Sequence, residues 1–229
     1  MSFDKADAPA EYPPELSRLP PGRHGLPRDF VVHNQRERLI AGLAEAVAEK
    51  GYGGTTIADI TRHAAVSRRT FYEHFDGKDE CFVAAFDTVT EQMRERVDEA
   101  FKAEDEWPLA LRSGIEAMLA FLASEPNLAR LAMVEALVAG PVVVERYDAA
   151  VQTFLPYLSE GRKGASKAVL KHLSDSTEEA LVGGMVSLVS RRIVAGQTEE
   201  LESLLPDLTE FTLAPFVGSE KAARVAKQG

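Results

Sequence analysis

The sequence predicts an all-α fold in which a small N-terminal helical domain precedes a larger helical one. After residue 30, apolar residues recur at spacings of three and four, and glycines and prolines separate the stretches that show this period. No sustained alternation of polar and apolar residues, the pattern of β-strands, is present. Hydrophobic residues make up 45% and charged residues 27% of the 229 residues, which excludes a mostly disordered chain.

Residues 1–30 are expected to form an extended basic arm. Six of the twelve prolines fall within residues 1–28, where they fix φ and remove backbone donors, so neither an ordinary helix nor a central strand is expected. Arg18, Arg23, His24 and Arg28 lie in the same segment. Two interpretations stay open: a disordered leader with no role, or a basic arm that lies on DNA phosphates or in a minor groove.

The first helix is predicted over residues 31–50, because its apolar residues share one face. The run Gly51-Tyr52-Gly53-Gly54 is expected to end it, since glycine readily adopts the left-handed conformation favoured just after a helix. The residues on the apolar face are Leu39, Ile40, Leu43, Ala44 and Val47.

Two short helices follow. Thr56 and Asp59 stand in the relation of a capping box, which starts the second helix at Thr56, and this helix ends by Ala65. Ser67 is placed to cap a third helix over residues 68–75.

The remaining chain is predicted to be helical as well. Asp76-Gly77 ends the third helix, and Asp76 with Asp79 is expected to cap a fourth. Pro156 should end or kink a helix. Further boundaries are expected at Trp107-Pro108, Glu125-Pro126, Gly140-Pro141, Gly161–Gly164 and Gly196, and two apolar helices are expected over 180–189 and 201–216.

Residues 56–75 have the pattern of a helix-turn-helix that reads the major groove of DNA. On the third helix Phe71 and Phe75 share one side and pack inward, which leaves Arg69, Thr70 and Glu73 on the opposite side. Arginine pairs with guanine through two hydrogen bonds, and threonine contacts a base edge or the thymine methyl group. These residue types at this spacing point to sequence-specific DNA binding.

The distribution of charge leaves room for this interpretation. The net charge of −10 argues against nucleic acid when the chain is taken whole. Residues 18–78, however, contain 10 Lys and Arg against 7 Asp and Glu, whereas residues 81–229 contain 15 against 23. The acidity therefore belongs to the C-terminal part.

Residues 36–84 contain a set of residues at fixed spacing: Gly51-Tyr52, Thr56, Ile60, Val66-Ser67, Thr70-Phe71-Tyr72, Phe75 and Lys78. With this set, the segment resembles the TetR family of bacterial one-component repressors. Ala65 departs from the family pattern, which usually has glycine there, and a left-handed conformation at this position would strain alanine by about 1 kcal/mol.

The resemblance implies a DNA-binding domain over residues 31–77 and an effector-binding and dimerisation domain over residues 78–229. It implies a homodimer formed through the last two long helices, which binds a palindromic double-stranded DNA operator with half-sites about 34 Å apart. A small molecule of unknown identity would release the repressor from DNA. The DNA contacts of the family map onto Thr56, Ser67, Arg68, Arg69, Thr70, Tyr72, His74 and Lys78.

Large adaptable side chains of the C-terminal part are candidates for the wall of an effector pocket, with ordinary core packing as the alternative for each of them. Cys81 is expected to be a core residue rather than a redox sensor, because no second cysteine exists. The candidates for the pocket are Trp107, Met118, Phe121, Met133, Tyr147, Phe154, Tyr157 and Met185.

No cofactor, metal site or catalytic activity is expected. No nucleophile–base pair, phosphate loop or metal-ligand spacing is visible. No stretch has the ~20 apolar residues of a membrane helix, and no secretory signal is evident, so we expect a cytoplasmic protein. The alternatives are a helical enzyme with a structural helix-turn-helix unit and a transcriptional activator that uses the same DNA contacts.

Overall fold

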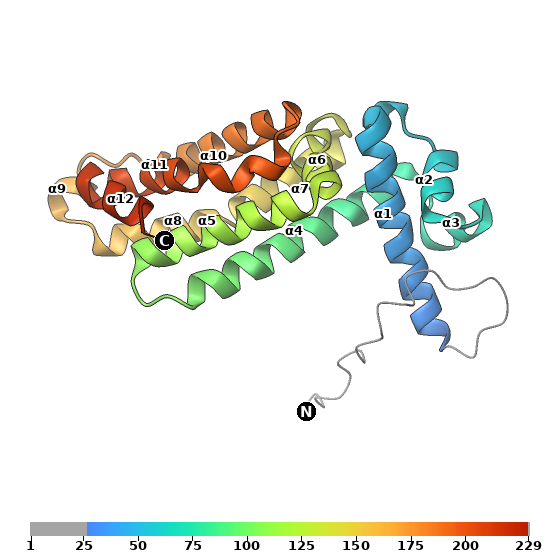
Figure 1. Cartoon of the computed structure of the whole chain (residues 1–229), viewed down its shortest axis with the longest axis horizontal. Coiled ribbons are helices and arrows are strands. Elements are labelled where there is room, and N and C mark those ends of the chain that lie inside the picture. Colours follow the sequence, from blue (N-terminus) through green and yellow to red (C-terminus); the bar gives the residue numbers. More distant parts are fainter. Residues whose placement is uncertain (1–26, 229) are drawn as a thin grey trace.

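The computed structural model describes residues 27–228, and every regular element in that range is a helix (Figure 1). The helices form two parts, a head made of α1–α3 and a longer body made of α4–α12. Residues 1–26 of the predicted basic arm lie outside the described residues.

The head comprises α1 (Arg28–Gly54), α2 (Ile57–Ala64) and α3 (Arg68–His74). In Figure 1, α1 stands across one end of the body, α2 and α3 lie on its outer side, and α4 runs from the head along the body. The body comprises α4 (Lys78–Lys102), α5 (Trp107–Ser124), α6 (Pro126–Met133), the 3₁₀-helix η2 (Glu135–Val138), α7 (Pro141–Gln152), α8 (Leu155–Gly164), α9 (Lys167–Leu170), α10 (Thr177–Val194), the 3₁₀-helix η3 (Thr198–Leu204), α11 (Leu205–Val217) and α12 (Ser219–Ala226).

Helix α1 begins three residues before the predicted start. Pro27 precedes it with φ −55°, close to the helical value, and Asp29 places an acidic group in the first turn, where the helix dipole favours it. At the other end Gly51 has φ 69°, so the predicted positive φ in the glycine run is confirmed, and the chain bends there.

The caps of α2 and α3 are confirmed, but the predicted cap of α4 is wrong. Thr56 and Asp59 form the capping box of α2, and the Ser67 hydroxyl accepts the Thr70 amide of α3. Helix α4 instead follows Gly77 without a side-chain cap. Neither Asp76 nor Asp79 caps it, and the Asp79 carboxylate accepts the Tyr52 hydroxyl.

Helices α1 and α2 approach each other closely at Gly42. A Cβ atom on Gly42 would lie 2.7 Å from the Ala64 amide nitrogen and 2.8 Å from the Ile60 carbonyl oxygen. The Arg38 guanidinium donates to the carbonyls of Ala64 at 2.6 Å and Ala65 at 2.9 Å, where the C-terminal end of α2 favours a cation. Backbone contact and charge together fix the position of α2 on α1.

Proline and glycine delimit the body helices as predicted. Pro126 and Pro141 open α6 and α7, and Pro156 is the second residue of α8. Proline is compatible with the first turn of a helix because its missing N–H has no partner there in any case. Within residues 27–228, no helix combines the length and the apolar character needed to cross a bilayer.

Candidate nucleic-acid interface and ligand cavity

The outer side of α3 presents polar side chains, and buried aromatic rings on its inner side hold the helix in place. Phe71 and Phe75 are 0% and 3% exposed in the head core, whereas Tyr72 is 55% exposed and its ring packs edge-on against Phe71. The Arg69 side chain is 89% exposed, and its Nε donates to the Glu73 carboxylate at 3.0 Å. Arg68 is exposed beside it. Buried aromatic rings on one side of α3 thus fix the helix, which carries two guanidinium groups and a tyrosine hydroxyl on its other side.

Hydroxyl groups at the starts of α2 and α3 are fixed by capping. Ser67 Oγ accepts the Thr70 amide at 3.0 Å and lies 2.9 Å from the hydroxyl of the half-buried Thr70. The exposed Thr56 hydroxyl donates to the Asp59 carboxylate at 2.7 Å. The Lys50 ammonium, 2.5 Å away, and the Thr56 hydroxyl hold the pKa of Asp59 well below its usual range, which keeps the capping box ionised.

Two predicted DNA contacts, His74 and Lys78, lie behind this surface. His74 Nε2 is 3.2 Å from the Gln35 amide oxygen, and burial, followed by the charge of Arg36, lowers the pKa of His74. The Lys78 ammonium donates to the carbonyls of Tyr52 at 2.8 Å and Thr55 at 3.1 Å. These two side chains bind within the protein, whereas the other predicted contacts are exposed or half-buried at the start of α2 and along α3.

The strain predicted at Ala65 is present. Ala65 has φ 50° and ψ 45°, the left-handed conformation, and is the positive-φ residue other than glycine in the described range. We expect Ala65→Gly to raise the free energy of unfolding by about 1 kcal/mol, because glycine has no Cβ to strain. Urea unfolding followed by circular dichroism measures this. Ala58→Gly, at an exposed position inside α2, should lower stability by a similar amount; a loss of stability in both variants would contradict the assignment.

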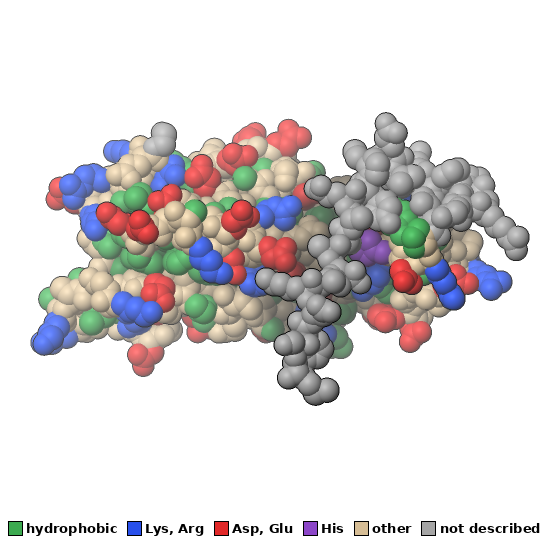
Figure 2. Space-filling model, turned by 90° about the horizontal axis from the view of Figure 1, so that it is seen from below, with side chains coloured by type: hydrophobic (Ala, Val, Ile, Leu, Met, Phe, Trp, Pro, Cys, Tyr) green, Lys and Arg blue, Asp and Glu red, His purple; other side chains and the backbone are tan. Residues whose placement is uncertain are grey.

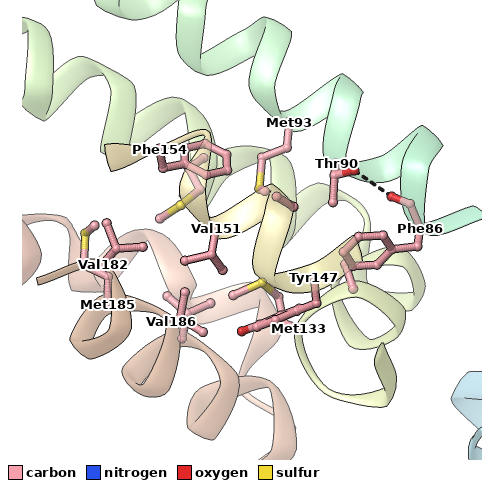
Figure 3. A pocket seen from close by; sticks show the side chains of 14 residues that line it. Phe86, Thr90, Met93, Met133, Tyr147, Val151, Phe154, Val182, Met185 and Val186 are labelled. Carbon is pink, nitrogen blue, oxygen red and sulfur yellow. Dashed lines mark hydrogen bonds between the residues drawn. The ribbon is translucent and has the colours of Figure 1, made fainter. Parts of the chain in front are cut away.

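A largely apolar cavity lies between α4, α5, α6, α7 and α10 (Figure 3). It encloses about 610 Å³ of space free of protein atoms, including the part open to solvent. The Thr90 hydroxyl on its wall donates to the Phe86 carbonyl at 2.8 Å and is thereby satisfied within α4. The other polar side chain on the wall is Tyr147, whose pKa is raised by burial and by the nearby Asp148.

Five of the predicted pocket residues line this cavity. Methionine and aromatic side chains dominate its wall, and Figure 3 shows them converging from several helices. A second cavity of about 370 Å³ adjoins it, lined in part by Tyr157. The predicted residues on the first wall are Met118, Met133, Tyr147, Phe154 and Met185, and the second cavity shares Met118, Phe154 and Met185 with it.

Trp107 and Phe121, also predicted to line the pocket, lie outside both cavities. The Trp107 indole occupies the space left by the missing Cβ of Gly161, packs edge-on against Phe216, and donates from Nε1 to the Tyr157 carbonyl at 2.7 Å. Phe121 is 3% exposed and lies under the Arg96 guanidinium, 4.5 Å from the ring centroid. Both rings therefore serve helix packing.

The comparisons with known proteins agree with this geometry. The family model described as "Bacterial regulatory proteins, tetR family" matches residues 39–85, which span the end of α1, α2, α3 and the start of α4. Residues 39–85 thus match the TetR family. The matched segment is the head together with its junction to the body, so the family likeness is carried by the candidate DNA-binding surface.

Curated relatives match the chain over different lengths. The regulator EthR of Mycolicibacterium smegmatis is 25% identical over 187 residues, 79% of this chain and 83% of that protein. An uncharacterised regulator in the lacX 3′ region of Lactococcus lactis is 30% identical over 35% of this chain and 41% of its own length. The nucleoid occlusion factor SlmA of Vibrio cholerae is 27% identical over 43% and 50%. The chain therefore spans about half the length of the last two.

Solved structures establish the fold over most of the chain. The fatty acid degradation regulator FadR of Bacillus halodurans superposes with a TM-score of 0.69 at 16% identity, covering 78% of this chain and 94% of that one. FadR of Bacillus subtilis, solved in complex with stearoyl-CoA, gives 0.65 at 20% identity, covering 80% and 98%. The described helices thus form an N-terminal helix-turn-helix domain followed by a larger helical domain.

Neither the cysteine nor the charged groups of the described residues form a further site. Cys81 is fully buried, and burial raises the pKa of its thiol to about 12, so the described structure places it in the core. Within residues 27–228 no three His, Cys, Asp or Glu side chains are arranged to hold a metal ion. Acidic and basic side chains are mixed over the face of the body in Figure 2.

Sequence reasoning missed several residues that shape both sites. Gly42 and Arg38 position α2 through contacts distant in sequence. Phe86, Val151 and Val186 line the cavity but look like ordinary core residues, since their helical spacing is that of any buried face. The glycine at 42 breaks a helical pattern and is the one local signal among them that indicates a close backbone approach.

Proposed function

We propose that the protein is a dimeric transcriptional regulator that binds a palindromic operator and is released from it by a small apolar ligand. The observation that carries this proposal is the exposed polar side of α3, held on the buried rings of Phe71 and Phe75. A rigidly held helix matters because contacts to nucleotide bases require side chains that stay in register with the groove.

The proposed DNA contacts divide by chemistry. Arg68 and Arg69 read base edges or neutralise phosphates, and Tyr72 donates its hydroxyl to a phosphate. The internal hydrogen bonds favour structural roles for the other two residues: His74 joins α3 to Gln35 of α1 within the head, and Lys78 holds the end of α1 to the body. Further phosphate contacts at the helix starts come from the capped hydroxyls of Thr56, Ser67 and Thr70.

The proposed dimer interface is formed by α10 and α11. On these helices Gly183 is exposed, and a Cβ atom added to it would meet nothing within 4 Å. Phe211 is 46% exposed where its ring lies over Gly184, and Val194, 63% exposed, extends the exposed apolar surface along α10. An exposed ring beside small residues supports close packing of a second copy, which would present two heads to one face of the duplex.

The proposed ligand is apolar where it is buried. Among the described residues no charged side chain lines either cavity, and four methionines supply walls that adapt to shape. The FadR neighbour of Bacillus subtilis was solved with stearoyl-CoA, a molecule with a long apolar chain, which supports a chain-like apolar ligand here. Because a buried charge without a partner is costly, any ionised part of the ligand must lie outside the cavity.

The test is operator binding by the full chain carrying both Arg69→Ala and Tyr72→Phe, on duplex DNA selected from random sequence by the unaltered protein. We expect the affinity for the operator to fall by about 10–100-fold, because one arginine contact to a base contributes about 1–3 kcal/mol. The slope of log K against log salt should also become shallower, because phosphate contacts are lost. Arg224→Ala, at an exposed position of α12, is the matched control. Unchanged affinity of the double variant would reject the assignment.

A further inference from the structure

The head and the body meet at Tyr52, and the body holds each polar group of this residue. Its ring packs edge-on against Phe82 with centroids 4.9 Å apart, and its hydroxyl donates to Asp79. Its carbonyl accepts from Lys78, whose ammonium also lies 4.1 Å from the centre of the ring. These contacts come from α4 and fix the C-terminal end of α1 on the body.

A second contact to Tyr52 comes from a different part of the body. The backbone N–H of Tyr52 donates to Glu135 Oε2 at 2.9 Å, and Glu135 Oε1 lies 3.2 Å from Arg130. Glu135 is 6% exposed, which is rare for a carboxylate unless its oxygens are bound. The buried carboxylate therefore joins η2 to the end of α1.

The conformation of Gly51 makes this contact accessible. With φ 69° and ψ 165° it takes the following amide out of the helical hydrogen-bond pattern of α1. A Cβ atom on Gly51 would lie only 3.5 Å from Glu135 Oε2, so the carboxylate sits directly against the bend. The bend presents one backbone donor, and Glu135 is its acceptor.

Glu135 is also close in sequence to the cavity wall. Ala132 and Met133, at the end of α6, line the cavity, and the Ser190 hydroxyl of α10 donates to the Met133 carbonyl at 2.9 Å. Only Val134 separates Met133 from Glu135, the first residue of η2. The cavity wall and the carboxylate that holds the Tyr52 amide therefore belong to one short segment.

We propose that Glu135 is the positioning residue that couples the state of the cavity to the orientation of the head. This inference rests on the proposed function, since it names how that function is regulated. The ligand moves the end of α6, the carboxylate moves with it, and the bond to the Tyr52 amide lengthens or breaks. The head then loses one of its attachments to the body and leaves the DNA-competent position.

The experiment replaces the ligand by a cavity-filling substitution. Ala150 lines the cavity from α7, so Ala150→Phe places a ring inside it, whereas Ala149→Phe at the exposed neighbouring position is the matched control. Each is combined with Glu135→Leu, which removes the acceptor, and with Glu135→Gln, which retains one. Operator affinity and hydrogen exchange of the Tyr52 amide are measured for every full-length variant, after a thermal melt establishes that it is folded.

We expect Ala150→Phe to weaken operator binding about tenfold and to speed exchange of the Tyr52 amide when position 135 is Glu or Gln. In the Glu135→Leu background the affinity change should shrink below about threefold. An equal change with and without the acceptor would overturn the inference, as would unaltered Tyr52 exchange in Ala150→Phe. If Ala150→Phe speeds exchange of the Tyr52 amide but the unaltered protein binds no DNA, the proposed function is rejected and the coupling stands. Should Glu135→Leu not fold, the Tyr52 exchange of Ala150→Phe alone decides.

Discussion

Replacing Gly42 with valine should unfold the head and abolish DNA binding while the body stays folded. The new Cβ would lie 2.7 Å from the Ala64 nitrogen and 2.8 Å from the Ile60 oxygen, both of which are backbone atoms. Backbone atoms cannot rotate away as the end of a side chain can, so α1 and α2 must separate. Overpacking of this kind costs about 1–3 kcal/mol or more, and valine adds two methyl groups beyond the Cβ.

Ala41→Val, at the exposed neighbouring position, is the control and should leave both parts intact. Amide hydrogen exchange resolved along the chain separates the head from the body. We expect rapid exchange over residues 28–75 and unaltered protection in α5 and α10 of the Gly42 variant. Full DNA affinity in that variant would show that the close approach of α1 and α2 is not needed for the head.

Val151→Asp should strongly weaken the binding of a neutral apolar probe. Val151 lies on the cavity wall, and among the residues that the structure describes no charged side chain lines either cavity (Figure 3). A carboxylate there keeps water in the cavity or must be desolvated by the ligand, an effective penalty of several kcal/mol, so affinity should fall about 100-fold. Titration with the fluorescent amine N-phenyl-1-naphthylamine measures it.

Gln152→Asp places the same charge at the adjacent exposed position and should leave probe affinity unchanged. Dodecanol should displace the probe from the unaltered protein more effectively than dodecanoate, because the alcohol brings no charge into the cavity. Probe binding that survives Val151→Asp would place the ligand elsewhere in the molecule.

The head could be predicted from the sequence because its signals are local. Thr56 and Ser67 cap the helices they precede, and the spacing of Phe71 and Phe75 identifies the inward side of α3. The error at Asp79 has a local and a tertiary cause: Asp79 is the second residue of α4, past the cap position, and the hydroxyl of Tyr52, distant in sequence, donates to its carboxylate. Local signals fail where a distant residue competes for the same group.

The cavity could be predicted only in part. Met118 and Tyr147 were predicted to line a pocket because their side chains are large, and they do line the cavity. Trp107 is large as well, but its indole fills the space that Gly161 leaves and so serves packing. Whether a ring fills a gap or borders one depends on the shape of its neighbours, which periodicity does not encode. Glu135 had no local signal, since its partner is a backbone amide of another domain.

Selection of duplex DNA from random sequence by the full-length protein tests the central claim, that the rigid head binds DNA as one half of a two-fold dimer. We expect enrichment of inverted repeats whose half-sites lie about 10 base pairs, or slightly more, from centre to centre. Binding of the selected duplex should weaken steeply as salt rises. Failure to enrich any sequence, or retention of DNA that does not depend on salt, would contradict the account.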